Sequence, residues 1–300
     1  RRSFAIAAAF GMASILSVLV LGDESGYETG EVQKVKLAAI EAEWNTEPAP
    51  ASFTLFGIPN QEEMRTDYAI KIPYALGIIA TRSLDGQVTG LKDLKSEHEL
   101  RVRNGMTAYD LLTKLQSGDK SDDTRARFDE VKQDLGYGLL LKRYTPNVTD
   151  ATDEQIKAAV DDSIPQVLPL FFAFRIMVAC GILMLVLIGL AFYDSTRHKI
   201  GERKWLLKAL LYGIPLPWIA IEAGWFVAEY GRQPWTIAEM LPTYVSASNI
   251  PASEIWFSLI GIFLFYTVLL IIEMYLMFKY ARLGPSSLKT GKYHFEQSKA

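Results

Sequence analysis

Apolar residues gather in four blocks, each long enough or nearly long enough to cross a bilayer. The blocks run from Phe4 to Leu21, from Val167 to Tyr193, from Trp205 to Tyr230 and from Ile255 to Tyr280. About 20 apolar residues suffice for a membrane-spanning helix. Polar residues fall mainly between positions 22 and 166. The pattern therefore predicts an all-α polytopic membrane helix bundle of four spans, with a large and mostly helical domain outside the membrane.

Basic residues next to the spans predict which side of the membrane each loop occupies. Arg1 and Arg2 precede the first span, four basic residues fill the link 197–204, and the loop 231–254 contains only Arg232. Because cytoplasmic loops are rich in lysine and arginine, we expect 23–166 and 231–254 to lie outside the cytoplasm. The predicted segments are spans at 1–22, 167–193, 204–230 and 255–281, an extracytoplasmic domain at 23–166, an extracytoplasmic loop at 231–254 and a cytoplasmic tail at 282–300.

The polar domain shows helical periodicity in several stretches. Charges at three- and four-residue spacing predict solvated helices at 97–115 and 123–135, and 150–162 has the pattern of a further polar helix. The segment 32–44 predicts an amphipathic helix, in which Lys36 and Glu41 have the pattern of ordinary solvated charges. Prolines on both sides of Phe53–Ile58 predict a loop or a short extended segment. His98 has no second ligand at helical spacing, so we expect an exposed imidazole without a metal.

Composition and charge exclude several classes of protein. Hydrophobic residues make up 50% of the chain and charged residues 22%, a split too polarised for one soluble domain. A net charge of −3 without a basic stripe argues against nucleic acid as a partner. The single cysteine, Cys180, lies in the second apolar block, which leaves no intramolecular disulfide. The chain opens on Arg1-Arg2 and a span without an initiator methionine, so we expect the C-terminal part of a longer protein.

The third apolar block carries two carboxylates on one helical face. Trp218, Glu222, Trp225 and Glu229 are spaced by four, three and four residues. A carboxylate at membrane depth costs roughly 2.5–3.5 kcal/mol, so it normally faces a partner, a cavity or a metal. For Glu229 alone, a place in an interfacial aromatic belt is the competing interpretation.

Other features of the spans leave their roles open. Pro215 and Pro217 should break the third span. The role of Glu222 stays undecided, and Glu273 in the fourth span is equally compatible with a structural role and with a proton relay.

Arg175 in the second block requires an anion. A carboxylate, a lipid phosphate or a cofactor propionate would each serve, and snorkelling to the headgroups is a further possibility. Met177 follows two residues later, and a thioether beside such a cation is what a haem ligand next to a propionate anchor requires.

Several motifs in order resemble subunit I of cytochrome bd, the bacterial quinol oxidase. They are Gly231-Arg232-Gln233-Pro234-Trp235 after Glu229, the cluster Phe174–Met177, and Gly22–Tyr27 followed by Lys36 and Glu41. The likeness runs from about Arg1 to Lys299, and the long polar domain is similar to the extended quinol loop of the proteobacterial type. The family's N-terminal portion, with its histidine haem ligands, has no counterpart in this sequence.

The resemblance implies a role for seven residues. Met177 would be an axial ligand of the low-spin haem b, with Arg175 stabilising its reduced state. Glu229 would be the ligand of the high-spin haem b, Trp225 would lie on the electron path between the b haems, and Arg232 would hold propionates. Lys36 and Glu41 would contact the quinol or accept its protons.

The resemblance also implies cofactors, partners and location. The cofactors would be haem b558, haem b595 and haem d, with ubiquinol or menaquinol as substrate and dioxygen reduced to water without proton pumping. The partners would be subunit II and a small accessory membrane subunit. The protein would sit in the bacterial inner membrane with residues 23–166 on the periplasmic side.

Two other classes of protein compete with this interpretation. Proline-broken spans and intramembrane carboxylates also suit an ion-coupled secondary transporter, which would show inverted repeats. A structural membrane subunit without a cofactor is the second. Only the oxidase requires haem absorption bands.

Overall fold

A computed structural model describes residues 2–83, 85–118, 121–199 and 201–283, so most of the predicted cytoplasmic tail lies outside the described residues. Helices dominate the described parts, and their strands form two small two-stranded sheets, which confirms the all-α prediction. The chain divides into two units, Arg1–Ser246 and Ala247–Ala300. In the described part of the second unit the chain forms the long helix α11 (Ala252–Leu283).

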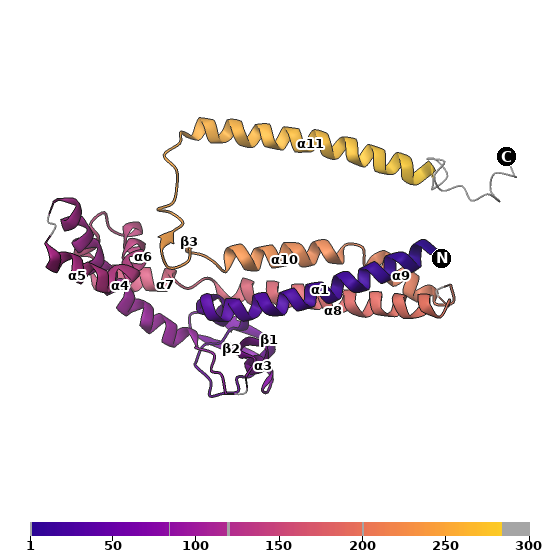
Figure 1. Ribbon diagram of the computed structural model, residues 1–300, viewed down its shortest axis with the longest axis horizontal. Coiled ribbons are helices and arrows are strands. Elements are labelled where there is room, and N and C mark those ends of the chain that lie inside the picture. The colour runs from indigo at the N-terminus through magenta and orange to yellow at the C-terminus, as the bar shows by residue number, and fades with distance from the viewer. Residues whose placement is uncertain (1, 84, 119–120, 200, 284–300) are drawn as a thin grey trace. The chain divides into compact units, whose positions relative to one another are not determined.

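Four helical segments of the described chain are long and apolar enough to span a membrane, as the sequence predicted. They are α1 (Arg2–Val32), α8 (Val167–Thr196), α9 (Lys204–Tyr212) with α10 (Leu216–Tyr230), and α11. Figure 1 shows α1 and α10 alongside α8, and both helices contact it. The break between α9 and α10 falls where the two prolines predicted it, with Pro215 capping α10 and Pro217 in its first turn, where no backbone N–H is needed.

Helix α1 continues beyond the apolar block into the acidic segment that follows it. Asp23 and Glu24 both pair with Arg82, at 2.8 and 2.7 Å, and the Arg82 guanidinium lies 4.6 Å from the centre of the Tyr27 ring. These contacts come from a residue distant in sequence, so hydrophobicity along the chain could not indicate where the helix ends.

The short helix α2 (Lys34–Glu41) carries two of the predicted site residues, Lys36 and Glu41. Its buried residues Ala38, Ala39 and Ile40 share a core with Val167, Leu170 and Phe171 of α8 and with Val227 of α10. Ala42 ends the helix in a left-handed conformation, with φ of 53°. Helix α2 is therefore clamped against the ends of two spans.

A β-hairpin follows α2, and its second strand was not predicted. Strands β1 (Phe53–Asn60) and β2 (Arg65–Ile72) pair in antiparallel fashion. Helix α3 (Ala75–Thr81) packs Leu76 and Ala80 into a small core beneath the hairpin. The proline-flanked segment is thus extended, and tertiary pairing turns it into a strand.

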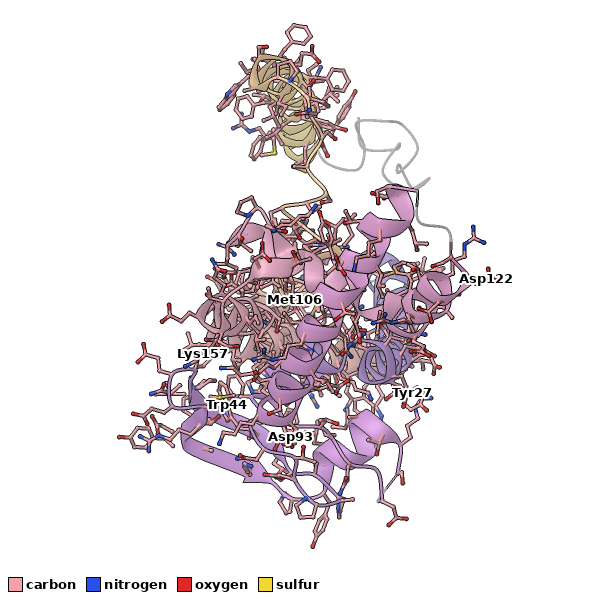
Figure 2. All side chains as sticks on the ribbon, turned by 90° about the vertical axis from the view of Figure 1, so that its left-hand side faces the viewer. Tyr27, Trp44, Asp93, Met106, Asp122 and Lys157 are labelled. Atoms are coloured by element: carbon pink, nitrogen blue, oxygen red, sulfur yellow. The ribbon has the colours of Figure 1, made fainter. Side chains whose placement is uncertain are left out.

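The remaining polar residues form a helical lobe, which we define as residues 91–162. It comprises α4 (Leu91–Gln116), α5 (Asp122–Val131), η1 (Lys132–Asp134), α6 (Leu135–Leu139), η2 (Leu140–Arg143), η3 (Val148–Asp150) and α7 (Asp153–Asp162). Helices α4 and α6 cross at glycines, since a Cβ on Gly105 would lie 2.3 Å from the Gly138 backbone nitrogen. Figure 2 shows charged side chains over the surface of the lobe, Asp122 and Lys157 among them.

The lobe packs against the segment that follows α10 and forms an ion pair with it. Strands β3 (Trp235–Ile237) and β4 (Leu241–Pro242) form a small hairpin, and Trp235 is buried in the core of the lobe beside Tyr137. Arg101 Nη1 pairs with Glu239 at 2.8 Å. The turn at Gly231–Trp235 is therefore held from outside the spans.

Gly136→Ala should weaken the packing of the lobe against the segment that follows α10. A Cβ at Gly136 would lie 2.0 Å from the Glu239 carbonyl oxygen, so the backbone of one partner has to move. Such overpacking costs about 1–3 kcal/mol, which should lower the unfolding temperature measured by calorimetry. Gly22→Ala is the matched control, because no atom lies within 4 Å of that Cβ and alanine is the better helix former. Equal unfolding temperatures for the two variants would contradict the prediction.

Candidate functional site

Arg175 reaches its anion in the polar segment that follows the first span. Its Nη2 pairs with Glu41 Oε2 at 3.0 Å, and Nη1 donates to the carbonyl oxygens of Ile40 at 2.7 Å and Phe171 at 3.1 Å. The Nε atom donates to the Thr54 carbonyl oxygen at 3.1 Å. Among the three anions that the sequence left open, the structure shows a carboxylate and adds backbone carbonyl groups.

The Arg175–Glu41 pair ties together segments far apart in sequence. Arg175 belongs to α8, Glu41 ends α2, and Thr54 belongs to β1. The guanidinium also covers the Phe171 ring at 3.3 Å from its centre. Only 3% of the Glu41 side chain and 13% of the Arg175 side chain are exposed, so the pair is shielded from water.

Burial raises the pKa of Glu41 to about 7, although the neighbouring Arg175 guanidinium opposes the rise. Burial likewise raises the pKa of Glu43 to about 7, with a further contribution from Glu47. A carboxyl group with such a pKa both accepts and returns protons near neutral pH.

A cavity of about 250 Å³ brings three of the predicted site residues together. Lys36, Glu41 and Met177 all line this space, which we call the Met177 cavity; Ser25, Gly26, Thr29, Phe174, Gly224, Val227 and Ala228 are among its other residues. A Cβ at Gly224 would lie 3.0 Å from the Met177 sulfur, so α10 leaves room for the thioether. The lining is mainly apolar, and its polar side chains are Ser25, Thr29, Lys36 and Glu41.

Glu229 and Arg232 form a second group at the end of α10. The Arg232 Nη2 atom donates to Glu229 Oε2, and both side chains are partly exposed. The Arg232 Nε atom is buried without a partner among the described residues. Trp225, on the same face of α10, is 64% exposed, and Glu222 is exposed as well. The predicted shared face exists, and within the described residues it is not covered.

Lys36 links the two groups. Its Cγ atom lies 3.1 Å from the position of a Cβ at Gly231, which directly precedes Arg232. Burial lowers the pKa of Lys36, as does the charge of Arg232, while Glu229 opposes this shift. The sequence alone had shown Lys36 and Glu41 as ordinary solvated charges, and the burial of Glu41 corrects that view.

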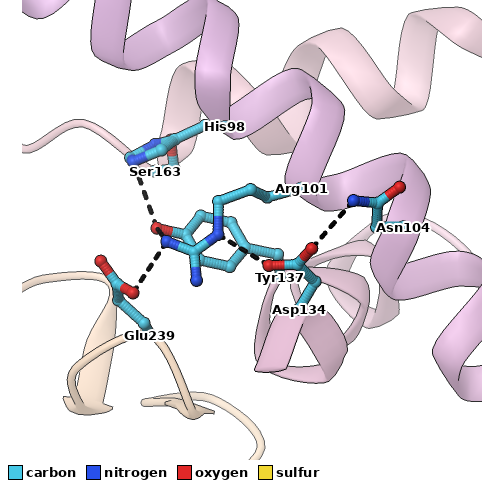
Figure 3. Close-up of polar contacts among 7 residues, drawn as sticks. All are labelled: His98, Arg101, Asn104, Asp134, Tyr137, Ser163 and Glu239. Atoms are coloured by element: carbon cyan, nitrogen blue, oxygen red, sulfur yellow. Dashed lines mark hydrogen bonds and ion pairs between the residues drawn. The ribbon is translucent and has the colours of Figure 1, made fainter. Parts of the chain in front are cut away.

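The prediction of an exposed His98 was wrong. The imidazole is 3% exposed, with Nδ1 at 2.7 Å from Ser163 Oγ and Nε2 at 3.2 Å from the Tyr137 hydroxyl (Figure 3). Ser163 Oγ donates to the Val160 carbonyl oxygen, so His98 Nδ1 must carry the proton and Tyr137 must donate to Nε2. Burial, together with Arg101, lowers the pKa of His98 to about 4, which keeps the ring neutral.

The residues around His98, which the sequence did not indicate as neighbours, form one network of polar contacts. Arg101 pairs with Asp134 at 2.7 Å and with Glu239 at 2.8 Å, and its guanidinium lies 4.2 Å from the centre of the Tyr137 ring. Charges at helical spacing on α4 suggested a solvated helix, whereas one face of that helix is buried. A histidine on the side of the helix that carries Leu91, Leu94 and Val102 was the available signal.

Comparison with known proteins identifies the family. A family model described as cytochrome bd terminal oxidase subunit I matches residues 1–285. The chain belongs to this family. The resemblance carried by the motifs around Met177 and Glu229 is thereby confirmed, and so is the membrane character of the protein.

Two curated members of the cytochrome bd family align with nearly the whole chain. The chain is 49% identical over 289 residues to cytochrome bd-II ubiquinol oxidase subunit 1 of Escherichia coli K12, covering 96% of this chain and 56% of that protein. It is 26% identical over 285 residues to cytochrome bd ubiquinol oxidase subunit 1 of Bacillus subtilis 168, covering 95% and 49%. The chain thus spans about half the length of these relatives.

Proposed function

We propose that this chain is part of the haem-bearing subunit of a terminal quinol oxidase, which oxidises quinol and reduces dioxygen to water. Both relatives above carry the name of a ubiquinol oxidase subunit 1. The observation that carries the proposal is the Met177 cavity, in which an amine and a carboxyl group from α2 and a thioether from α8 line one space. Neither of the competing classes requires this combination.

The residues present fit haem at two places. Met177 offers a thioether on the cavity wall, and the small residues Gly224 and Ala228 of α10 line the same space. Glu229 offers a carboxylate, and the partnerless Nε of Arg232 beside it suits a propionate oxygen. Met177 would then hold the low-spin haem b558 and Glu229 the high-spin haem b595.

The residues of the chain would act on the quinol as proton acceptors. A quinol hydroxyl loses its proton as electrons leave, and Glu41 with a pKa of about 7 is suited to take it. Lys36, whose pKa is lowered by burial, can take the other proton once it has released its own. Arg175 positions Glu41 and leaves positive charge close to Met177, which favours the reduced haem.

Membership of the cytochrome bd family suggests the haem chemistry, the electron path, the location and the partners of the proposed enzyme. Bound haem b and haem d would supply one-electron transfer and reduction of dioxygen. Trp225 would lie between the b haems, and proton motive force would arise without pumping, because quinol protons leave outside while protons for water come from the cytoplasm. We place the protein in the bacterial inner membrane with residues 23–166 in the periplasm, beside subunit II, a small accessory subunit and the lipid bilayer, with ubiquinol or menaquinol as substrate.

Glu41→Gln in the complete enzyme should slow quinol oxidation by roughly 10²-fold, because general bases contribute 10²–10⁴-fold. Only the ionised carboxylate accepts a proton, so the rate of the unaltered enzyme should fall as pH drops through about 7, and Glu41→Gln should lose that dependence. Lys36→Met should slow the same step. Stopped-flow reduction of the haem by quinol measures these rates.

Haem absorption spectra provide the control. All bands should persist in both variants, because the side-chain amide introduced by Glu41→Gln can still accept a hydrogen bond from Arg175. Unchanged kinetics in both variants would remove Lys36 and Glu41 from the site. Absence of haem bands from the unaltered enzyme would favour a transporter or a structural subunit instead.

Cysteine labelling tests the proposed topology. We expect labels at Ser117→Cys, in the lobe, and at Glu202→Cys, in the link between α8 and α9, to react from opposite sides of the membrane. Both positions are exposed, and Cys180, the natural cysteine, is buried and can be replaced by serine. Reaction of both labels from the same side would contradict the topology.

A further inference from the structure

A second cavity, of about 290 Å³, lies on the other side of Lys36. Its walls come from the end of α1, from α2, α4 and α6, and from the segment after α10. We call it the His98 cavity; the polar residues that matter here are Glu31, Lys36, Glu97, His98, Arg101 and Glu239. Lys36 is the only described residue that lines both this cavity and the Met177 cavity.

The two cavities differ in character. The Met177 cavity is mainly apolar, whereas three carboxylates line the His98 cavity. Glu31 and Glu97 are exposed, so the His98 cavity reaches solvent through them, while Glu239 is half-buried and held by Arg101. At about 30 Å³ per water, a space of this size has room for several water molecules with polar partners.

We propose that the His98 cavity is the exit for protons released by quinol oxidation, with Lys36 as its entrance and Glu239 and Glu97 as the groups that carry protons outward. The inference rests on the proposed quinol oxidase function. Glu41 cannot serve as the exit by itself, because it lines the Met177 cavity but not the His98 cavity, and only 3% of its side chain is exposed.

The proton balance is simple. One quinol gives two electrons to the haem acceptor and two protons to the protein, and becomes quinone. The Lys36 ammonium passes a proton to water in the His98 cavity and takes a quinol proton in its place, first directly from one hydroxyl and then from Glu41, which holds the second. The water passes each proton through Glu239 or Glu97 to bulk solvent, and Lys36 ends as the ammonium with which it began. The lowered pKa of Lys36 eases the loss of its proton to water.

The buried neutral groups of the cavity act as its wall. His98 donates a hydrogen bond from Nδ1 to Ser163 Oγ and accepts one at Nε2 from the Tyr137 hydroxyl (Figure 3). Neither ring nitrogen is therefore available to relay a proton. Arg101 stays charged between Asp134 and Glu239 and fixes the carboxylate of Glu239 at the wall. The carboxylates and water are left to carry the proton.

The test compares two electron donors in the complete enzyme. Quinol releases protons on oxidation, whereas tetramethyl-p-phenylenediamine gives up an electron and no proton. The double variant Glu97→Gln/Glu239→Gln should slow turnover with quinol about tenfold and leave turnover with the diamine unchanged. Affinity for a redox-inert quinol analogue should also stay unchanged, which shows that the quinol site is intact.

Matched variants distinguish the effect of the lost carboxylates from the effects of cavity volume and of altered folding. Glu99→Gln lies on the same helix, is exposed and pairs with Arg103, and should have no effect. Ala238→Leu fills the cavity without altering any charge and should slow quinol turnover, whereas Ala126→Leu on the exposed face of α5 should not. Glu239→Asp should restore most of the rate lost in Glu239→Gln.

Three results would overturn the inference. They are an unchanged rate with quinol in the double variant, an equal loss with both donors, and weakened binding of the analogue. If the unaltered enzyme contained no haem and did not oxidise quinol, the proposed function would fall first, and the inference with it.

Discussion

Glu229→Ala is expected to remove the high-spin haem b signal and to reduce oxygen consumption on the order of 100-fold, a loss like that for altered metal-site residues. The carboxylate stands on an uncovered face of α10 with Trp225, and Arg232 pairs with it. Alanine removes the ligand and leaves the Arg232 guanidinium without its anion. The low-spin haem at Met177 should still be reduced by quinol, because Met177 lines a different space.

Absorption and magnetic circular dichroism spectra of the purified enzyme measure this outcome. Met177→Leu should do the converse: the low-spin spectrum changes, and the oxygen site still accepts electrons from artificial donors. Glu222→Gln is the matched control, since it lies two turns away on the same face and should keep all haem. A full complement of haem and normal turnover in Glu229→Ala would assign Glu229 to the interfacial aromatic belt.

Arg175→Met is expected to destabilise the protein by about 3–5 kcal/mol, the range for breaking a buried ion pair by removing one partner. Glu41 would be left buried without its cation, and the carbonyl oxygens of Ile40 and Thr54 would lose their donor. The lost positive charge should also lower the midpoint potential of the low-spin haem, because oxidised haem is the more positive state. Thermal unfolding and a redox titration measure the two effects.

Two further variants isolate the cause. Arg175→Lys keeps the charge but lacks the planar group that reaches Glu41 and three backbone segments together, so it should recover the potential better than the stability. Arg175→Met/Glu41→Gln should be more stable than Arg175→Met, since the uncompensated carboxylate is gone. An unfolding temperature of Arg175→Met equal to that of the unaltered protein would show that the pair does not hold α2 against α8.

The sequence by itself determined the spans, the break at Pro215 and Pro217, and the shared face of Trp225 and Glu229. These features follow from hydrophobicity and helical periodicity, which act between residues a few positions apart. Motif order was also enough to indicate the family, because Arg175, Met177, Glu229 and Arg232 occur in characteristic local contexts.

Only the tertiary structure decided which anion Arg175 binds, whether His98 is buried, and what Lys36 lies between. Glu41 is separated from Arg175 by 134 residues, and Ser163 from His98 by 65. In the sequence, His98 stands between Glu97 and Glu99, and Glu41 alternates with Ala42 and Glu43, so neither has the surroundings of a buried residue. Their burial comes from helices that pack over them from distant parts of the chain, and packing of this kind leaves no periodic signal near the residue that it covers.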